Sequence, residues 1–75
     1  MTTLKVSVGS SDFLVRCNLA EASSPVMANY GDGWQDTQYQ CADTSHRTSG
    51  LVAIATQLAI AAFECSENDT EISVV

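Results

Sequence analysis

Apolar and polar residues alternate along the first part of the chain, and an alternation of period two is typical of β-strands. Residues 4–8 read Leu-Lys-Val-Ser-Val and residues 13–17 read Phe-Leu-Val-Arg-Cys, with an apolar residue at every second position. The interval 9–12 holds the small and polar residues of a turn between antiparallel strands. The sequence therefore predicts a β-hairpin at its start.

Turn-forming residues dominate residues 21–33, which predicts a loop there with a short extended piece at 26–28. A third strand is expected over residues 37–42, where Tyr39 and Cys41 alternate with glutamines. This segment is polar enough to lie at the edge of a sheet.

The apolar residues at positions 51, 54, 55, 58, 61 and 62 follow helical spacing. They come after a series of helix-capping residues, so a helix is expected from Ser49 to Cys65. Residues 71–75 have the composition of a closing strand. The order predicts one domain over residues 1–75 with an α+β fold, a two-layer sandwich in which an antiparallel sheet of three to four strands packs against one long helix.

The predicted helix is apolar on more than one side, because Val52, Ala59 and Phe63 form a second apolar row. Two interpretations remain open. The helix is either an alanine-rich helix packed tightly on a small sheet, or it presents a face for self-association or a partner. A symmetric homodimer through the helix or the last strand would add the buried surface that a chain of this length lacks.

The net charge of the chain limits the kinds of macromolecule that it is expected to bind. The chain has nine acidic and three basic residues, a formal net charge of −6. A surface of that sign repels nucleic acids and anionic membranes and attracts basic protein surfaces. The candidate contacts among these acidic residues fall into two groups, Asp32, Asp36 and Asp43 in the first and Glu64, Glu67, Asp69 and Glu71 in the second. The alternative is that these carboxylates are simply solvated.

Tyr30 and Trp34 flank a Gly-Asp-Gly turn and are the candidate aromatic contacts. Tyrosine and tryptophan often anchor interfaces because they bury a large area with few rotatable bonds. The alternative is that Trp34 and Tyr39 turn inward and complete a core that is poor in large side chains.

Catalysis and metal binding are not expected. Cys41, His46 and Asp43 could be arranged on paper as nucleophile, base and orienting group, but so small a domain offers no deep pocket. The cysteines are too widely spaced for a zinc motif, so we expect no metal or cofactor, with His46 near the helix start beside Asp43 or Ser45. The odd number of thiols and the lack of a signal-peptide pattern favour the cytoplasm.

Residues 30–46, Tyr-Gly-Asp-Gly-Trp-Gln-Asp-Thr-Gln-Tyr-Gln-Cys-Ala-Asp-Thr-Ser-His, are followed by an alanine-rich helix and resemble a segment of short bacteriophage and prophage proteins. The size, acidity and lack of a catalytic motif are similar to those of anti-CRISPR proteins and other phage anti-defence inhibitors. The resemblance implies a stoichiometric inhibitor, acting in the host bacterial cytoplasm, that occupies the basic DNA-binding surface of a CRISPR effector or blocks its moving parts.

Two alternatives come from other classes of protein. The weakly charged helix and the last strand favour a small homo-oligomeric assembly module of phage origin. A binder of small molecules at an oligomer interface is the other.

Overall fold

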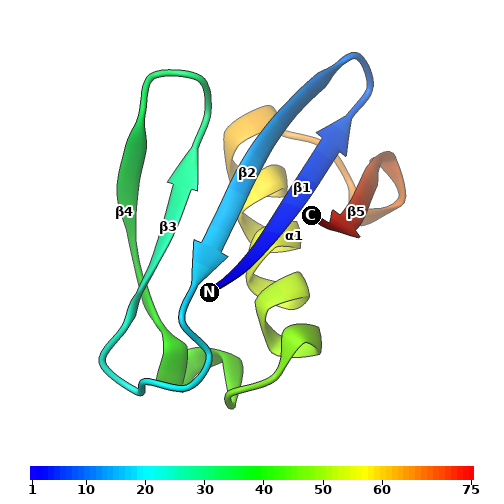
Figure 1. The fold of residues 1–75 in the computed structure, drawn as a ribbon. Helices are drawn as coiled ribbons and strands as arrows, with labels where there is room; N and C mark the ends of the chain where they lie inside the picture. The colour runs from blue at the N-terminus through cyan, green and yellow to red at the C-terminus, as the bar shows by residue number, and fades with distance from the viewer.

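A computed structural model describes all 75 residues and consists of one antiparallel sheet packed against one helix (Figure 1). The elements are β1 (Thr2–Val8), β2 (Ser11–Cys17), β3 (Pro25–Asn29), β4 (Trp34–Gln40), the 3-10 turn η1 (Cys41–Thr44), α1 (Thr48–Phe63), the 3-10 turn η2 (Glu67–Asp69) and β5 (Thr70–Val74). The strand order is β4-β3-β2-β1-β5. The α+β fold, the N-terminal hairpin and the closing strand are therefore confirmed.

The sheet has five strands, so the predicted number of three to four is wrong. The additional strand, β3, lies within residues 21–33, which were expected to form mainly a loop, and it contains the short extended piece that was expected at 26–28. Its residues Val26 and Ala28 are fully buried, and Ala28 pairs with Val15 of β2. Burial of these two side chains on the helix side outweighs the turn-forming tendency of the residues around them.

Strand β4 and helix α1 differ from their predicted boundaries. Strand β4 begins at Trp34 and ends at Gln40, so Cys41 and Ala42 lie in η1 instead of in the strand. Helix α1 ends two residues before the predicted Cys65, because Glu64 adopts the left-handed conformation with φ 52°. The polar strand β4 is an edge strand, as expected.

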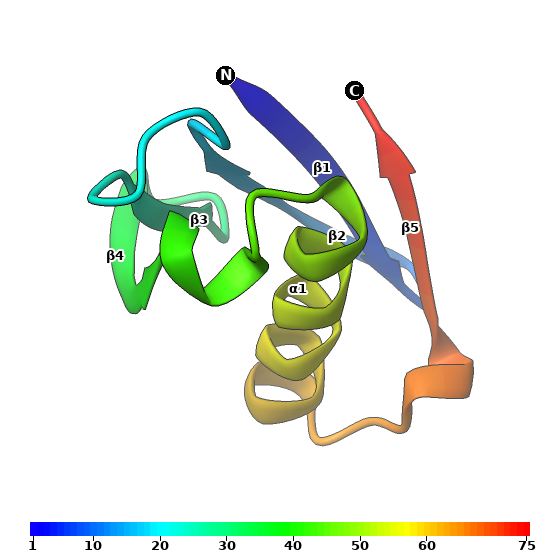
Figure 2. The ribbon, with the colours of Figure 1, turned by 90° about the horizontal axis from the view of Figure 1, so that it is seen from below.

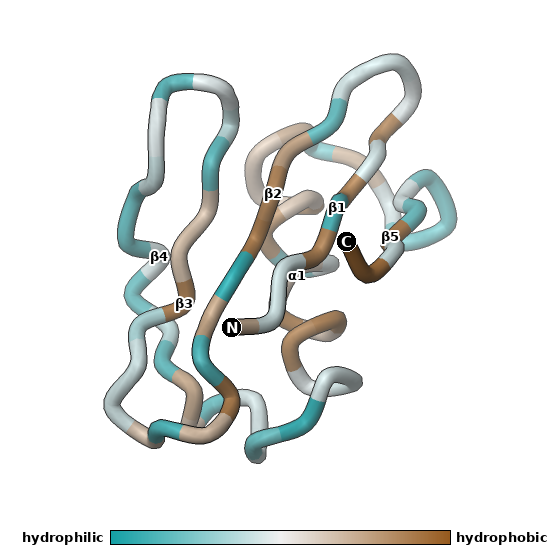
Figure 3. Tube along the Cα trace, viewed as in Figure 1, coloured by the Kyte–Doolittle hydropathy of each residue, from teal (hydrophilic) through white to brown (hydrophobic).

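The helix covers one face of the sheet (Figure 2). The core consists of apolar side chains from that face of β1, β2 and β3 and from the facing side of α1. Figure 3 shows the same division: hydrophobic residues follow β1, β2 and α1, whereas β4 is mostly hydrophilic. Arg16 and Met27, which are paired across β2 and β3, alternate with buried residues and therefore lie on the opposite face, called here the open face.

Packing of α1 against the sheet buries part of the second apolar row of the helix. Ala59 is fully buried, Val52 is half-buried, and Phe63 stacks on Phe13 of β2 with ring centroids 5.8 Å apart. Helix α1 has 16 residues, and no helix of the protein has both the length and the apolarity needed to cross a membrane.

Candidate protein-binding surface

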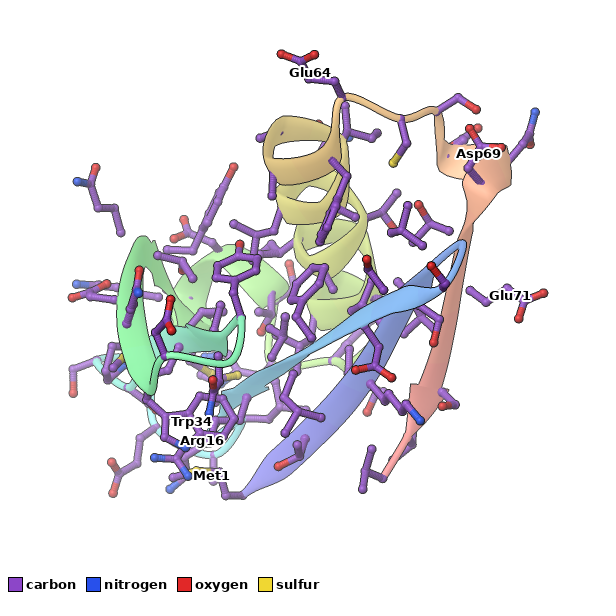
Figure 4. The ribbon with its side chains drawn as sticks, turned by 90° about the horizontal axis from the view of Figure 1, so that it is seen from above. Met1, Arg16, Trp34, Glu64, Asp69 and Glu71 are labelled. Atoms are coloured by element: carbon purple, nitrogen blue, oxygen red, sulfur yellow. The ribbon has the colours of Figure 1, made fainter.

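Tyr30 and Trp34 point to opposite faces of the sheet. The Tyr30 ring lies 4.7 Å from the ring of Phe13, a core residue on the helix side. The Trp34 ring lies on the open face, where the Arg16 guanidinium carbon is 3.9 Å from its centroid (Figure 4). The two rings therefore belong to separate surfaces, although only three residues stand between them.

The turn between these rings has a defined geometry. The Asn29 side-chain oxygen accepts hydrogen bonds from the backbone N–H groups of Gly31, at 2.8 Å, and Gly33, at 3.2 Å. Both glycines have positive φ, 114° and 103°, a conformation that other residues rarely adopt. The turn holds Asp32 exposed at its tip.

An aromatic stack links this turn to the end of the helix. Phe13 is buried and contacts the ring of Tyr30 on one side and that of Phe63 on the other. Tyr30 and Phe63 remain 38% and 37% exposed. Partial burial nevertheless raises the pKa of the Tyr30 hydroxyl above its usual value. Two aromatic side chains from distant parts of the sequence thus share one surface.

Three of the candidate carboxylates have local structural partners. Asp36 accepts a hydrogen bond from the Gln38 backbone N–H at 2.7 Å, and Asp43 accepts one from the Gln40 N–H at 2.8 Å. Asp69 accepts hydrogen bonds from the backbone and hydroxyl of Ser66 at 3.3 and 3.1 Å. These three residues stabilise turns, so their replacement would alter folding as well as charge.

The other four candidate carboxylates are exposed and have no hydrogen-bond or ion-pair partner. They are Asp32, Glu64, Glu67 and Glu71. Figure 1 shows the β3–β4 turn and the C-terminal end of α1 at the same end of the molecule, and in Figure 4 Glu64 and Glu71 extend away from the protein. We call Asp32, Glu64 and Glu67, together with the exposed rings of Tyr30 and Phe63, the acidic end. Glu71 is not part of it, because Glu71 pairs with Ser7 and lies on the open face of β5, at the opposite edge of the sheet from β4.

The three basic residues lie elsewhere. Lys5 forms the only ion pair, with Asp12 at 3.6 Å, and Arg16 covers Trp34 on the open face. Arg47 precedes the first residue of α1, whereas Glu64 follows the last. At 1.5 Å per helical residue these two charges are about 25 Å apart, beyond the Debye length of about 8 Å at physiological salt. The negative charge of the acidic end is therefore not neutralised within the molecule.

Glu64 occupies a position that disfavours it in two ways. Its φ of 52° is a left-handed conformation that glycine or asparagine adopts with less strain. Its carboxylate also lies beside the negative end of the helix dipole. A residue that violates two local preferences is often kept for a reason other than stability.

Cys41 and His46 do approach each other, although they are not arranged as a nucleophile and base. Cys41 Sγ lies 3.3 Å from His46 Nδ1, and both atoms contact the Leu19 carbonyl oxygen, at 3.2 and 2.7 Å respectively. Because a carbonyl oxygen only accepts, Nδ1 carries a hydrogen atom and donates a hydrogen bond to the Leu19 carbonyl. Nδ1 cannot then remove a proton from the thiol, and Cys41 is fully buried.

These contacts correct the expected surroundings of His46, which were Asp43 or Ser45. The backbone explains the difference, because Ser45 and His46 both have positive φ, 56° and 58°, and the chain reverses there toward the 18–24 loop. His46 still precedes the helix closely, as expected.

No cluster of three or more potential metal ligands and no pocket occurs in the protein. All three cysteines are free thiols, and burial together with the nearby Cys41 raises the pKa of Cys17. Neither Trp34, which is half-buried, nor Tyr39, which is 37% exposed, belongs to the buried core.

Phe63 is the residue of the acidic end that was not among the candidate contacts. It was assigned only to the second apolar row of the helix, because its neighbour Phe13 is fifty positions away in the sequence. The sequence did contain one indication that Phe63 could be a contact residue, because it directly precedes Glu64 at the end of an apolar helix.

No protein-family model, curated protein or solved structure matches this chain.

Proposed function

We propose that this protein is a non-catalytic inhibitor, encoded by a bacteriophage, that binds a basic nucleic-acid-binding surface of a bacterial defence complex through its acidic end. The observation that carries the proposal is the set of three exposed carboxylates without partners at the acidic end, Asp32, Glu64 and Glu67. A CRISPR effector is the first partner to test, since the chain resembles anti-CRISPR proteins in size, acidity and lack of a catalytic motif.

Electrostatics supports a basic partner. Uncompensated carboxylates attract a basic groove over a distance comparable to the Debye length and increase the rate of encounter. An inhibitor of this kind competes with the phosphates that the groove normally binds. The acidic residues of this protein are too few to imitate a long duplex, so the contact covers one patch of the groove.

The two exposed rings provide the part of the contact that does not depend on salt. Tyr30 and Phe63 are each about one-third exposed, and both are held in place by Phe13. Rigid aromatic side chains bury apolar area at little cost in conformational entropy. The partner surface is therefore expected to combine arginine or lysine residues with an apolar contact.

The test measures inhibition and binding together. Plaque formation by a CRISPR-targeted phage is counted on bacteria that express this protein and one of several CRISPR effector types. Binding of the purified protein to the same effector is measured at low and high salt. The proposal predicts rescue of the phage and salt-sensitive binding for at least one effector.

The variant that tests the surface carries Asp32→Asn, Glu64→Gln and Glu67→Gln. The control is Glu21→Gln, which removes an exposed carboxylate with no side-chain partner from the 18–24 loop. We expect the first variant to lose at least tenfold in affinity and the control to retain it. Equal binding by both, or rescue of the phage without binding to any effector, would refute the proposed surface.

The alternative of a homo-oligomeric assembly module has one observation in its favour. Strand β5 lies at an edge of the sheet and exposes Val74. Self-association at this edge is compatible with an inhibitor as well as with an assembly module.

A further inference from the structure

Strand β5 is an open edge of the sheet. It pairs only with β1, over five residue pairs without a register shift. Its exposed side chains include Val74, which is 66% exposed and lies on the helix side. It contains no proline, lysine or bulge, which are three of the features that prevent an edge strand from pairing with another chain, and Glu71 is its only charged residue.

The hydrogen-bond pattern identifies the backbone groups that are available. Val75 N–H donates to the Thr3 carbonyl at 2.9 Å, so residues 3 and 75 form a hydrogen-bonded pair. Hydrogen-bonded and non-hydrogen-bonded pairs alternate along an antiparallel ladder. Residues 73 and 71 therefore also bond to β1, whereas Ile72 and Val74 direct their N–H and C=O groups outward. Thr70 offers only its C=O group, because its N–H donates to the Glu67 carbonyl.

The other edge of the sheet is blocked. The β3–β4 ladder has a register shift between Pro25 and Met27, and Gln38 in β4 has φ 69°. Side-chain oxygens accept hydrogen bonds from three consecutive backbone N–H groups of β4, those of residues 38, 39 and 40. These local bonds occupy donors that a pairing strand would need. Only β5 retains a regular edge, on which the Thr70 N–H alone is already hydrogen-bonded.

The sequence of β5 suits antiparallel pairing with a second copy of itself. A twofold axis at Ile72 places Ile72 opposite Ile72, Thr70 opposite Val74 and Glu71 opposite Ser73. The two copies then form four hydrogen bonds, two between the Ile72 residues and one from each Val74 N–H to the Thr70 carbonyl of the other copy, and no glutamate lies directly opposite another. Ile72 and Val74 would also bring apolar side chains together on the helix side of the joined sheet.

We propose that two copies of this protein associate through β5 in this register and form a continuous ten-stranded sheet with both helices on one face. The occupant of the edge is a second copy because the register pairs the outward N–H and C=O groups of Ile72 and the outward N–H group of Val74 in both strands at once, as an isologous contact requires. Each copy has a formal charge of −6, so screening by salt favours the dimer. The effect of salt is thus opposite to that expected for binding to a basic partner.

The test is sedimentation equilibrium of the purified, untagged protein from micromolar to submillimolar concentration at low and high salt. The wild type is expected to approach twice 8.0 kDa and to dimerise more tightly in high salt. Val74→Pro removes an outward N–H group while the ladder to β1 remains, and Val74→Asp adds a charge at the edge. Each variant is expected to raise the dissociation constant at least tenfold.

Ala42→Asp is the matched control, because it makes the same charge change at an exposed position in η1, outside β5. It is expected to dimerise like the wild type. A wild type that is monomeric at submillimolar concentration overturns the proposal, as does an unchanged dimer in both Val74 variants. Circular dichroism verifies that each variant is folded, and Val74→Asp decides the result if Val74→Pro unfolds. The sedimentation experiment contains no partner protein, so a negative result in it does not bear on the inhibitor proposal, which has a separate test.

Discussion

Gly50 in the first part of α1 packs so closely against Thr44 that a Cβ atom at position 50 would overlap the Thr44 carbonyl group. Thr44 is buried, and its hydroxyl donates to the Cys41 carbonyl at 2.6 Å. The contact thereby fixes η1 against the start of the helix. It also positions the segment that leads from β4 to α1.

We predict that Gly50→Ala destabilises the protein even though alanine is the better helix former. The overlap involves backbone atoms, which cannot move aside as a flexible side chain can, so the cost is expected to be about 1–3 kcal/mol. Thermal or urea unfolding measures it. Ser49→Ala is the control at the adjacent exposed position and is expected to change stability little. Wild-type stability in Gly50→Ala would mean that η1 and α1 can separate without cost.

The second prediction concerns stability at alkaline pH. Burial, with a smaller effect of Cys41, raises the pKa of Cys17 in the folded protein above 9.0, its unfolded value. The folded state therefore holds this proton more tightly, and the resulting stabilisation is complete below pH 9 and is lost as pH rises through the folded pKa. Tyr30, with a pKa raised above 10.0 by burial, acts in the same direction at higher pH.

Urea unfolding between pH 7 and 10.5 tests this expectation. The free energy of unfolding should be nearly constant up to about pH 8.5 and then fall. Cys17→Ala should be less stable at pH 7 and should decline less steeply above pH 9. Cys65→Ala controls for loss of a thiol and retains Cys17, so its alkaline decline should follow the wild type. Identical slopes in Cys17→Ala and the wild type would contradict the assignment to Cys17.

Elements with a strong hydrophobic period could be predicted from the sequence, and long-range contacts could not. The β1–β2 hairpin and α1 were predicted because their apolar residues repeat with the period of a strand or helix. Strand β3 was predicted only as a short extended piece at 26–28 and not as a strand of the sheet, because only Val26 and Ala28 alternate inward among turn-forming residues, and their burial depends on pairing with β2. The C-terminal boundary of α1 differed from its prediction because φ is positive at Glu64, a residue other than glycine.

The candidate surface was predictable in its charge and not in its geometry. Sequence proximity suggested one contact loop with Tyr30 and Trp34 together, but three intervening residues turn the chain so that the two rings face opposite sides. Sequence proximity also grouped Asp36 and Asp43 with Asp32, although the carboxylates of Asp36 and Asp43 accept hydrogen bonds from local backbone N–H groups. Such short hydrogen bonds depend on turn conformations that residue type alone does not specify.

The third prediction concerns Glu64, which is expected to lower the stability of the folded protein and to strengthen binding to a basic partner. Glu64→Gly removes the strain of the left-handed conformation and the charge beside the negative end of the helix dipole. We expect the variant to be more stable by about 1 kcal/mol in urea unfolding. Glu64→Gln removes the charge and retains a side chain in the strained conformation, so most of that gain should be absent.

Both Glu64 variants should bind a basic partner more weakly than the wild type by a similar factor, because both lack the same carboxylate. A binding assay at low salt, performed beside the unfolding measurement, separates the two effects. Greater stability with unchanged binding in Glu64→Gly would mean that this carboxylate has no part in recognition. Weaker binding in both variants, with greater stability only in the glycine variant, would indicate that the protein retains Glu64 for its partner at the expense of its own helix.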